Sequence, residues 1–142
     1  MSVSRPVPVP DAESAPYWEA AARHTLALAR CGRCAAFALP PGPTCPHCHA
    51  TEPGFSYEAV SGRGTVRSWT VVRQSALPGL ADEVPFVLVD VELDEQAGLR
   101  MIGRLLDGPN SPPRMGDRVR VTFEDVEPGV SVPAFAHGEV AS

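Results

Sequence analysis

Four cysteines constrain this chain more than any other feature of its sequence. All four fall within eighteen residues, as Cys31-Gly32-Arg33-Cys34 and, ten residues later, Cys45-Pro46-His47-Cys48. Two C-x-x-C turns can place four thiolates at the corners of a tetrahedron, which is the geometry of a closed structural zinc site. Such a metal also stabilises a segment that has few apolar residues of its own. The spacing therefore predicts a zinc-stapled ribbon whose hairpin tip is 40–43.

Other uses of these cysteines agree less well with the rest of the chain. Cys45 to His49 matches the C-x-x-C-H pattern of haem attachment, but that use needs an exported protein, and no apolar signal run precedes it. A thioredoxin-type pair needs a helix start after a buried strand, and two disulfides suit a secreted domain. Iron in a rubredoxin-like site uses the same ligands, so the sequence leaves both zinc and iron open.

The rest of the chain is predicted to form short strands. Its 16 Pro and 12 Gly make up about a fifth of the residues, which disfavours a helical bundle. The apolar content of 44% is enough for a core, yet no apolar stretch is long enough to span a bilayer. We expect a cytoplasmic protein with no membrane contact.

Period-two alternation marks the strands. In residues 86–94 the apolar positions Val87, Val89, Val91 and Leu93 alternate with acids. Similar segments cover 64–72, 99–106, 118–125 and 130–135, with no helix between them. The predicted fold class is mostly β: a short N-terminal helix and a rubredoxin-like zinc ribbon, then a five-stranded antiparallel OB-fold barrel. The predicted division is a flexible arm at 1–13, helix and ribbon at 14–54, barrel at 55–137 and a tail at 138–142.

Local signals place the helix just before the ribbon. Ser14 offers a side-chain oxygen for an N-terminal cap, and Pro16 suits a first helical position. Helix formers continue from Tyr17 to Arg23, and a short strand is expected to run into Cys31.

Charge limits the partners of the chain. Twelve Arg, no Lys and 17 acidic residues give a net charge of −5, all of it within residues 56–142. Proteins that bind a phosphate backbone usually present a basic surface, because their affinity comes largely from counterion release. Nucleic acid is therefore disfavoured. A single-stranded nucleic-acid-binding OB-fold protein remains the alternative function, because such barrels use stacking aromatics.

Several motifs together resemble a known family. They are Pro16-Tyr17-Trp18-Glu19, the two cysteine pairs, Ser61-Gly62-Arg63-Gly64-Thr65-Val66, Val89-Asp90-Val91-Glu92-Leu93 and Phe123-Glu124-Asp125-Val126. From about residue 14 to 137, the chain resembles the zinc-ribbon OB-fold proteins that accompany thiolases. The resemblance implies a non-catalytic auxiliary subunit that binds a thiolase-superfamily enzyme, such as a thiolase, a lipid-transfer-protein-like thiolase or an acyl-CoA retro-aldolase. It also implies help in binding or channelling acyl-CoA, and in some members a hot-dog-fold enoyl-CoA hydratase as a further partner.

The residues themselves agree with a subunit that is not an enzyme on its own. Ser61, Ser68 and Ser75 have no His and acid nearby, and His24 and His137 are isolated. The predicted metal ligands are Cys31, Cys34, Cys45 and Cys48.

Two groups of residues are candidates for surface contacts. Arg63, Arg67 and Arg73 on one strand are candidates for the phosphates of acyl-CoA, or else they pair with acids across the sheet. Candidates for the partner interface are Tyr17, Trp18, Leu77 and Leu80.

Overall fold

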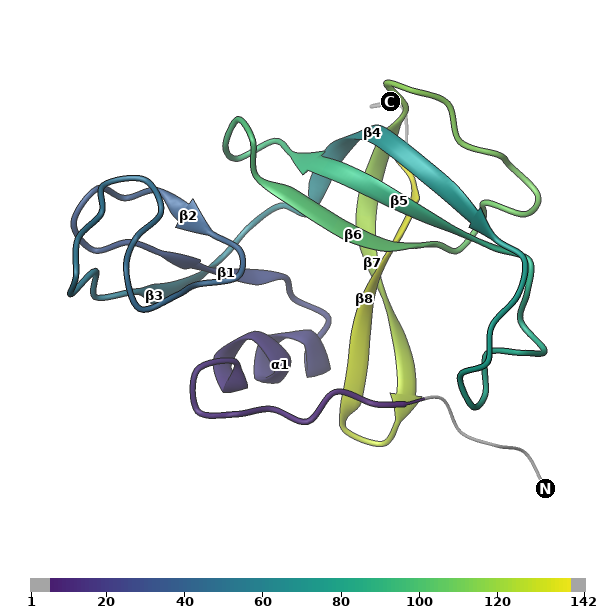
Figure 1. Ribbon diagram of the computed structural model, residues 1–142, viewed down its shortest axis with the longest axis horizontal. Coiled ribbons are helices and arrows are strands. Elements are labelled where there is room, and N and C mark those ends of the chain that lie inside the picture. The colour runs from purple at the N-terminus through teal and green to yellow at the C-terminus, as the bar shows by residue number, and fades with distance from the viewer. Residues whose placement is uncertain (1–5, 139–142) are drawn as a thin grey trace.

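The computed structural model describes residues 6–138 of the chain. A three-stranded sheet lies on one side and a closed five-stranded barrel on the other, with a short helix below the junction between them (Figure 1). The mostly β fold that the sequence predicts is confirmed. The first five residues of the predicted arm and residues 139–142 of the predicted tail lie outside the described part.

The smaller sheet carries the cysteine pairs. Its central strand β1 (Ala27–Arg30) runs into Cys31, as predicted, and pairs antiparallel with both β2 (Phe37–Ala38) and β3 (Ser56–Ala59). β3 follows residue 54, where the ribbon is predicted to end, and pairs over its whole length with the ribbon strand β1. The predicted boundary between 54 and 55 stays a proposal.

The helix α1 (Ala15–Ala22) has Pro in its first turn and Ser14 at its N-cap position, as predicted, but the Ser14 side chain forms no capping hydrogen bond. The Ser14 hydroxyl instead accepts a hydrogen bond from the Asp11 backbone N–H at 3.1 Å, while Asp11 Oδ1 accepts one from the Ser14 N–H at 2.7 Å. This reciprocal pair occupies the oxygen that a cap would need. The helix buries Ala20 and Ala21 and contacts β1 and β8.

The barrel contains five strands in the order β4-β5-β6-β8-β7. They are β4 (Arg63–Val72), β5 (Phe86–Leu93), β6 (Arg100–Leu105), β7 (Arg118–Glu127) and β8 (Val130–His137). The prediction of a purely antiparallel barrel is wrong, because β6 and β8 pair in parallel at Leu105 and Phe135. Five is an odd number, so a closed ring of five strands cannot alternate in direction throughout and needs at least one parallel neighbour.

A single hydrophobic core continues from the barrel to the ribbon. The inward positions predicted on β5 (Val87, Val89, Val91 and Leu93) are all buried. Leu26, Leu28 and Phe37 from the first part of the chain belong to the same cluster as these valines and Phe135. The two parts therefore pack as one body and share the stabilisation that apolar burial supplies.

A side-chain amide also joins the two parts. Gln96, in the turn between β5 and β6, accepts a hydrogen bond from the Phe37 N–H through Oε1 at 2.8 Å. Its Nε2 donates to the Phe37 carbonyl at 3.0 Å. Gln96 thus pairs with β2 as a neighbouring strand would, and fixes how the ribbon sits on the barrel.

Replacing Gln96 by Ala is expected to lower the free energy of unfolding by about 1–2 kcal/mol, because two hydrogen bonds to the Phe37 backbone are lost. Faster amide hydrogen exchange at Phe37 is the measurement that locates the effect. Gln74→Ala, at an exposed position, is the matched control. Equal protection of Phe37 in both variants would contradict the bridge.

A histidine ties the end of β8 to the loop before β7. His137 Nδ1 lies 3.0 Å from Asp107 Oδ2, and Nε2 lies 3.2 Å from Asp117 Oδ2. The expectation that His137 is isolated is therefore wrong, because the fold brings two acids to it from distant positions. Burial alone would lower the pKa of His137, but its hydrogen bonds to the two carboxylates outweigh burial and raise the pKa above 6.5.

The stability that this tie supplies should depend on pH. A histidine whose pKa is raised by folding stabilises the fold fully below its unfolded pKa of about 6.5, and the contribution is lost as pH rises through the folded value. We expect the free energy of unfolding to fall between about pH 6 and 8 by more in the native sequence than in His137→Gln. Parallel pH profiles for the two proteins would show that the tie contributes nothing.

Candidate metal centre and surface sites

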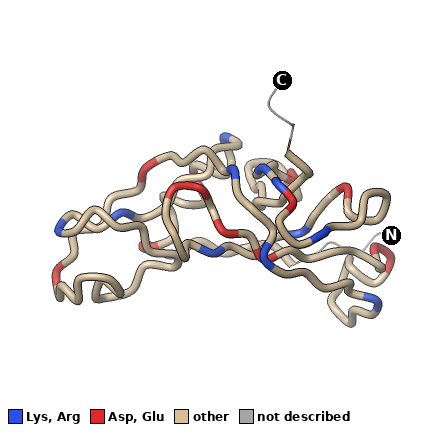
Figure 2. Tube along the Cα trace, turned by 90° about the horizontal axis from the view of Figure 1, so that it is seen from above, with Lys and Arg blue, Asp and Glu red and all other residues tan. Residues whose placement is uncertain are grey.

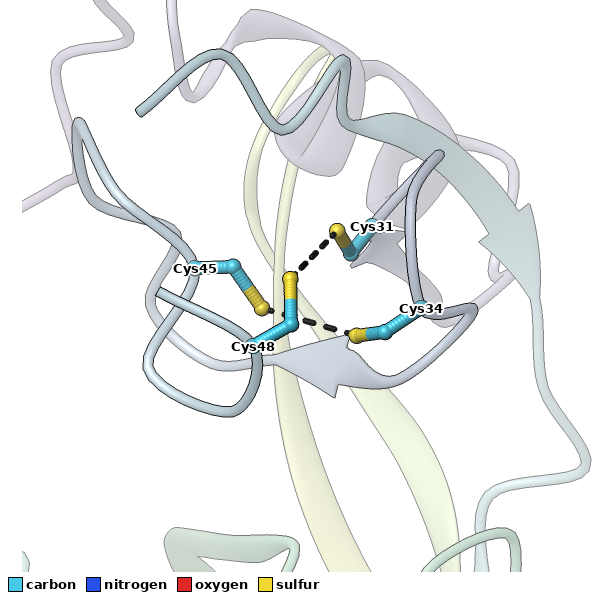
Figure 3. Close-up of side chains that lie close together, drawn as sticks. All are labelled: Cys31, Cys34, Cys45 and Cys48. Carbon is cyan, nitrogen blue, oxygen red and sulfur yellow. Dashed lines mark hydrogen bonds between the residues drawn. The ribbon is translucent and has the colours of Figure 1, made fainter. Parts of the chain in front are cut away.

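The four cysteine sulfurs converge at the end of the ribbon (Figure 3). Their Sγ atoms all lie within 4.8 Å of one another, with 3.8 Å between Cys31 and Cys48 and 3.7 Å between Cys34 and Cys45. A tetrahedron with metal–sulfur bonds of about 2.3 Å has edges of about 3.8 Å. The predicted set Cys31, Cys34, Cys45 and Cys48 is therefore positioned to bind one metal ion.

Both cysteine turns have the same backbone hydrogen bonds. The N–H of Ala35 donates to the Cys31 carbonyl, and the N–H of His49 donates to the Cys45 carbonyl, both at 2.9 Å. Ala35 and His49 adopt positive φ angles of 66° and 63°, which bring the chain back after each pair. The repetition of one turn geometry explains why two short C-x-x-C segments form one site.

Backbone amides favour thiolates in this cluster. The Arg33 N–H donates to Cys31 Sγ at 3.3 Å, and the His47 N–H donates to Cys45 Sγ at 3.4 Å. The Cys48 backbone N–H, with the His47 N–H, lowers the pKa of the Cys45 thiol to about 6. Since a bound metal needs deprotonated sulfur, these amides prepare the cluster for a cation.

The candidate arginines do not form one group. β4 has a bulge between Val66 and Ser68, so its two halves present different faces. Arg67 forms an ion pair with Glu92 on β5 at 2.9 Å, which is the cross-strand pairing that the sequence offered as the other possibility. Arg63 lies before the bulge and Arg73 follows the end of β4, both exposed. Their role in acyl-CoA binding stays a prediction.

The candidate interface residues divide in a similar way. Tyr17 packs against the hydrophobic core, while Trp18 contacts its ring edge-on and lines a groove of about 400 Å³ together with Pro8 and Pro10. Leu77 is 54% exposed, and Leu80 is half-buried. Interface roles for all four stay predictions.

Besides Leu77, the exposed apolar side chains include three on or next to the barrel strands. Trp69, Val71 and Leu106 are 42%, 37% and 38% exposed. Val71 pairs with Val87, which pairs with Leu105, so the end of β4, the start of β5 and the end of β6 meet at one end of the barrel. We call Trp69, Val71, Leu77 and Leu106 the apolar end. The exposure of Val71 could not be predicted from the sequence, where it is one apolar residue of a strand. Its exposure depends on where the strands of the barrel diverge.

His24 also has a partner, contrary to expectation. Its Nε2 lies 2.7 Å from Asp125 Oδ1, and the Ser131 hydroxyl donates to the same oxygen at 2.6 Å. The carboxylate thus separates the hydroxyl from the imidazole. A nucleophilic serine needs its base in direct contact, so these three residues do not form a catalytic arrangement. Their hydrogen bonds instead link the segment after α1 to the β7–β8 hairpin.

A four-sulfur ribbon packed on a five-stranded barrel defines the class of zinc-ribbon OB-fold proteins. Residues 18–54 match the family described as ChsH2, rubredoxin-like zinc ribbon domain, and residues 57–124 match the ChsH2 C-terminal OB-fold domain. The chain belongs to this ChsH2 family, which confirms the resemblance seen in the sequence.

Two curated relatives carry hydratase names. The chain is 30% identical over 131 residues to a "Probable enoyl-CoA hydratase alpha subunit" of Thermomonospora curvata, covering 92% of this chain and 39% of the relative. It is 41% identical over 71 residues to the "3-oxo-4,17-pregnadiene-20-carboxyl-CoA hydratase alpha subunit" of Mycobacterium tuberculosis, covering 50% of this chain and 22% of that protein. The chain thus spans about two fifths or less of their lengths.

A solved structure matches nearly the whole chain. The structure titled "Ltp2-ChsH2(DUF35) aldolase" aligns with a TM-score of 0.77 and 29% identity, over 92% of this chain and 98% of the matched one. Within residues 6–138, no helix is long and apolar enough to cross a membrane.

Replacing Cys48 by Ser is expected to lower metal content well below one ion per chain and to unfold the ribbon, because three sulfurs bind far more weakly than four. Elemental analysis and amide exchange across β1 and β2 are the measurements. His47→Ala, next to the ligands but outside the set, is the matched control and should keep its metal. A Cys48→Ser protein with full metal content and an ordered ribbon would contradict the assignment.

Proposed function

We propose that this chain is a non-catalytic subunit that binds an enzyme of the thiolase superfamily and helps it to bind or channel an acyl-CoA. The observation that carries the proposal is the match over almost the full length of both chains to the ChsH2 component of an aldolase assembly. The hydratase names of the curated relatives support the acyl-CoA class, and they add a hot-dog-fold enoyl-CoA hydratase as a candidate second partner.

The metal centre supports a structural role in this proposal. We propose zinc as the ion, because residues 18–54 match a rubredoxin-like zinc ribbon domain, and four sulfurs in a closed tetrahedral arrangement leave no position for a substrate. Zinc has no redox chemistry of its own, which suits an ion that holds the ribbon together. The chain then contributes shape and contacts, while the partner contributes the reacting groups. A cytoplasmic location, where such enzymes and reduced cysteines are found together, is part of the same proposal.

The apolar end is the candidate docking surface for the enzyme. Exposed apolar side chains that gather at one end of a folded domain commonly mark a protein interface. Leu77 is the most exposed of the four. The end of its loop contacts Arg104 of β6, which pairs with Glu83 and lies over the Phe86 ring. Within this loop the Leu77 carbonyl accepts a hydrogen bond from the Leu80 N–H at 3.2 Å, so Leu77 lies in a turn.

Nucleic-acid binding receives less support from the structure. On the barrel surface, Arg67, Arg100, Arg104 and Arg118 are each paired with an acid. A basic groove that follows a phosphate backbone needs such cations to be available.

Co-purification with a co-expressed thiolase-fold enzyme is the direct test. Leu77→Gln is expected to weaken the complex about tenfold, because truncating an apolar anchor at an interface costs more than about 1 kcal/mol. Ile102→Gln is the matched control, since Ile102 is 68% exposed on β6, where it pairs with Asp90 in the middle of β5. The isolated chain should show no turnover of acyl-CoA. An enzyme that is fully active and soluble without this chain would refute the proposal.

A further inference from the structure

Charged side chains on the outer face of the barrel are matched almost one to one. Strands β7, β4, β5 and β6 are neighbours, and positions opposite each other share a face. The ion pairs on this surface are Arg118–Asp94, Arg67–Glu92, Arg100–Asp90 and Arg104–Glu83. Blue and red segments are interspersed along the trace in Figure 2. Each of these arginines has one acid within ion-pair distance.

Arg63 and Arg120 break this pattern. They lie directly opposite each other where β4 pairs with β7, so two cations face each other across the strands. Both are exposed, and within residues 6–138 neither guanidinium has an ion pair with a carboxylate. Like charges directly opposite each other destabilise a sheet. The chain as a whole is acidic, with a net charge of −5, so two facing cations are unexpected in it. This pair of arginines is therefore a candidate anion-binding site.

The two nearby acids, Asp94 and Glu95, form their hydrogen bonds with other groups. Both oxygens of Asp94 are bonded to Arg118, at 2.7 and 2.5 Å. The Arg118 hydrogen bonds, with a smaller contribution from the charge of Arg63, lower the pKa of Asp94, so this acid stays ionised. Glu95 accepts a hydrogen bond from the Ser61 N–H at 2.7 Å. Three cations (Arg63, Arg118 and Arg120) lie near two carboxylates (Asp94 and Glu95), which leaves a local excess of about one positive charge.

A hollow of about 430 Å³ lies between these arginines. Its lining includes Ser61, Arg63, Arg118, Arg120 and Gly138. The Ser61 hydroxyl oxygen accepts a hydrogen bond from the Arg63 N–H at 3.2 Å, which leaves its proton available to a ligand. Guanidinium forks and a hydroxyl donor together match the oxygens of a phosphate group.

We propose that Arg63 and Arg120 bind a phosphate monoester, and that its source is the 3′-phosphate of coenzyme A. The identity of the source rests on the proposed function, whereas the phosphate chemistry rests on the arginine pair. A monoester carries about −1.5 to −2 charge at pH 7, so two facing guanidinium groups attract it more strongly than they attract either singly charged phosphate of the diphosphate bridge. The site differs from the set Arg63, Arg67 and Arg73, since the fold brings Arg120 beside Arg63 and pairs Arg67 with Glu92.

The test is a titration of the isolated, metal-loaded chain, followed by NMR signals of the arginine side chains, at constant ionic strength. Coenzyme A should bind with a dissociation constant on the order of 1 mM. Arg63→Ala and Arg120→Ala should each weaken it roughly tenfold, because a charge-assisted hydrogen bond is lost. Arg67→Ala is the matched control and should leave the affinity unchanged, since that guanidinium is already paired. Dephospho-coenzyme A should bind the native sequence as weakly as coenzyme A binds Arg120→Ala.

Other outcomes would overturn the proposal. Equal affinity for coenzyme A and dephospho-coenzyme A would show that the 3′-phosphate is not the group bound. Binding of inorganic phosphate but not of coenzyme A would assign the site to free phosphate. No response to any phosphate ligand would show that Arg63 and Arg120 do not bind phosphate, and would refute the proposal. No enzyme partner is present in this titration, so its failure leaves the co-purification result intact, and a failed co-purification leaves the phosphate affinity intact.

Discussion

The shared hydrophobic core is the interaction on which the rest of this structure depends. Leu26, Leu28 and Phe37 belong to the same cluster as the barrel valines, so the ribbon and the barrel share one core and do not form independent domains. Gln96 then fixes the register of the contact through the Phe37 backbone. The core and the metal therefore stabilise the ribbon together: the core buries Leu28 and Phe37, and the metal holds the two cysteine turns.

Features encoded by local pattern could be predicted from the sequence. The cysteine spacing specified the metal cluster, because each C-x-x-C turn closes on itself, and alternation along β5 specified which face is buried. Ser14 shows the limit of such reasoning: Asp11 competes for the hydroxyl that would have capped the helix. The parallel contact of β6 with β8 follows from closure of the whole ring, which no single segment encodes.

Charge pairing lay beyond local pattern for the same reason. Whether Arg67 meets Glu92 depends on strand register and on the bulge after Val66. The contact of Arg63 with Arg120 joins positions far apart in the sequence, so the sequence shows two ordinary arginines and the fold shows an opposed pair. The same holds for the two histidines. His24 and His137 have no partner nearby in the sequence, and the fold brings Asp125 to His24 and Asp107 to His137.

The arrangement of β4 keeps the two proposed surfaces apart. Arg63 begins this strand, and Val71 of the apolar end lies near its other end, eight residues later. At about 3.3 Å per residue, they are separated by roughly 26 Å. Sites more than about 10 Å apart with no shared partner act independently. A phosphate held by Arg63 and Arg120 therefore anchors one end of an extended ligand without disturbing the surface proposed for the enzyme, which is the division of work that a substrate-handling subunit needs.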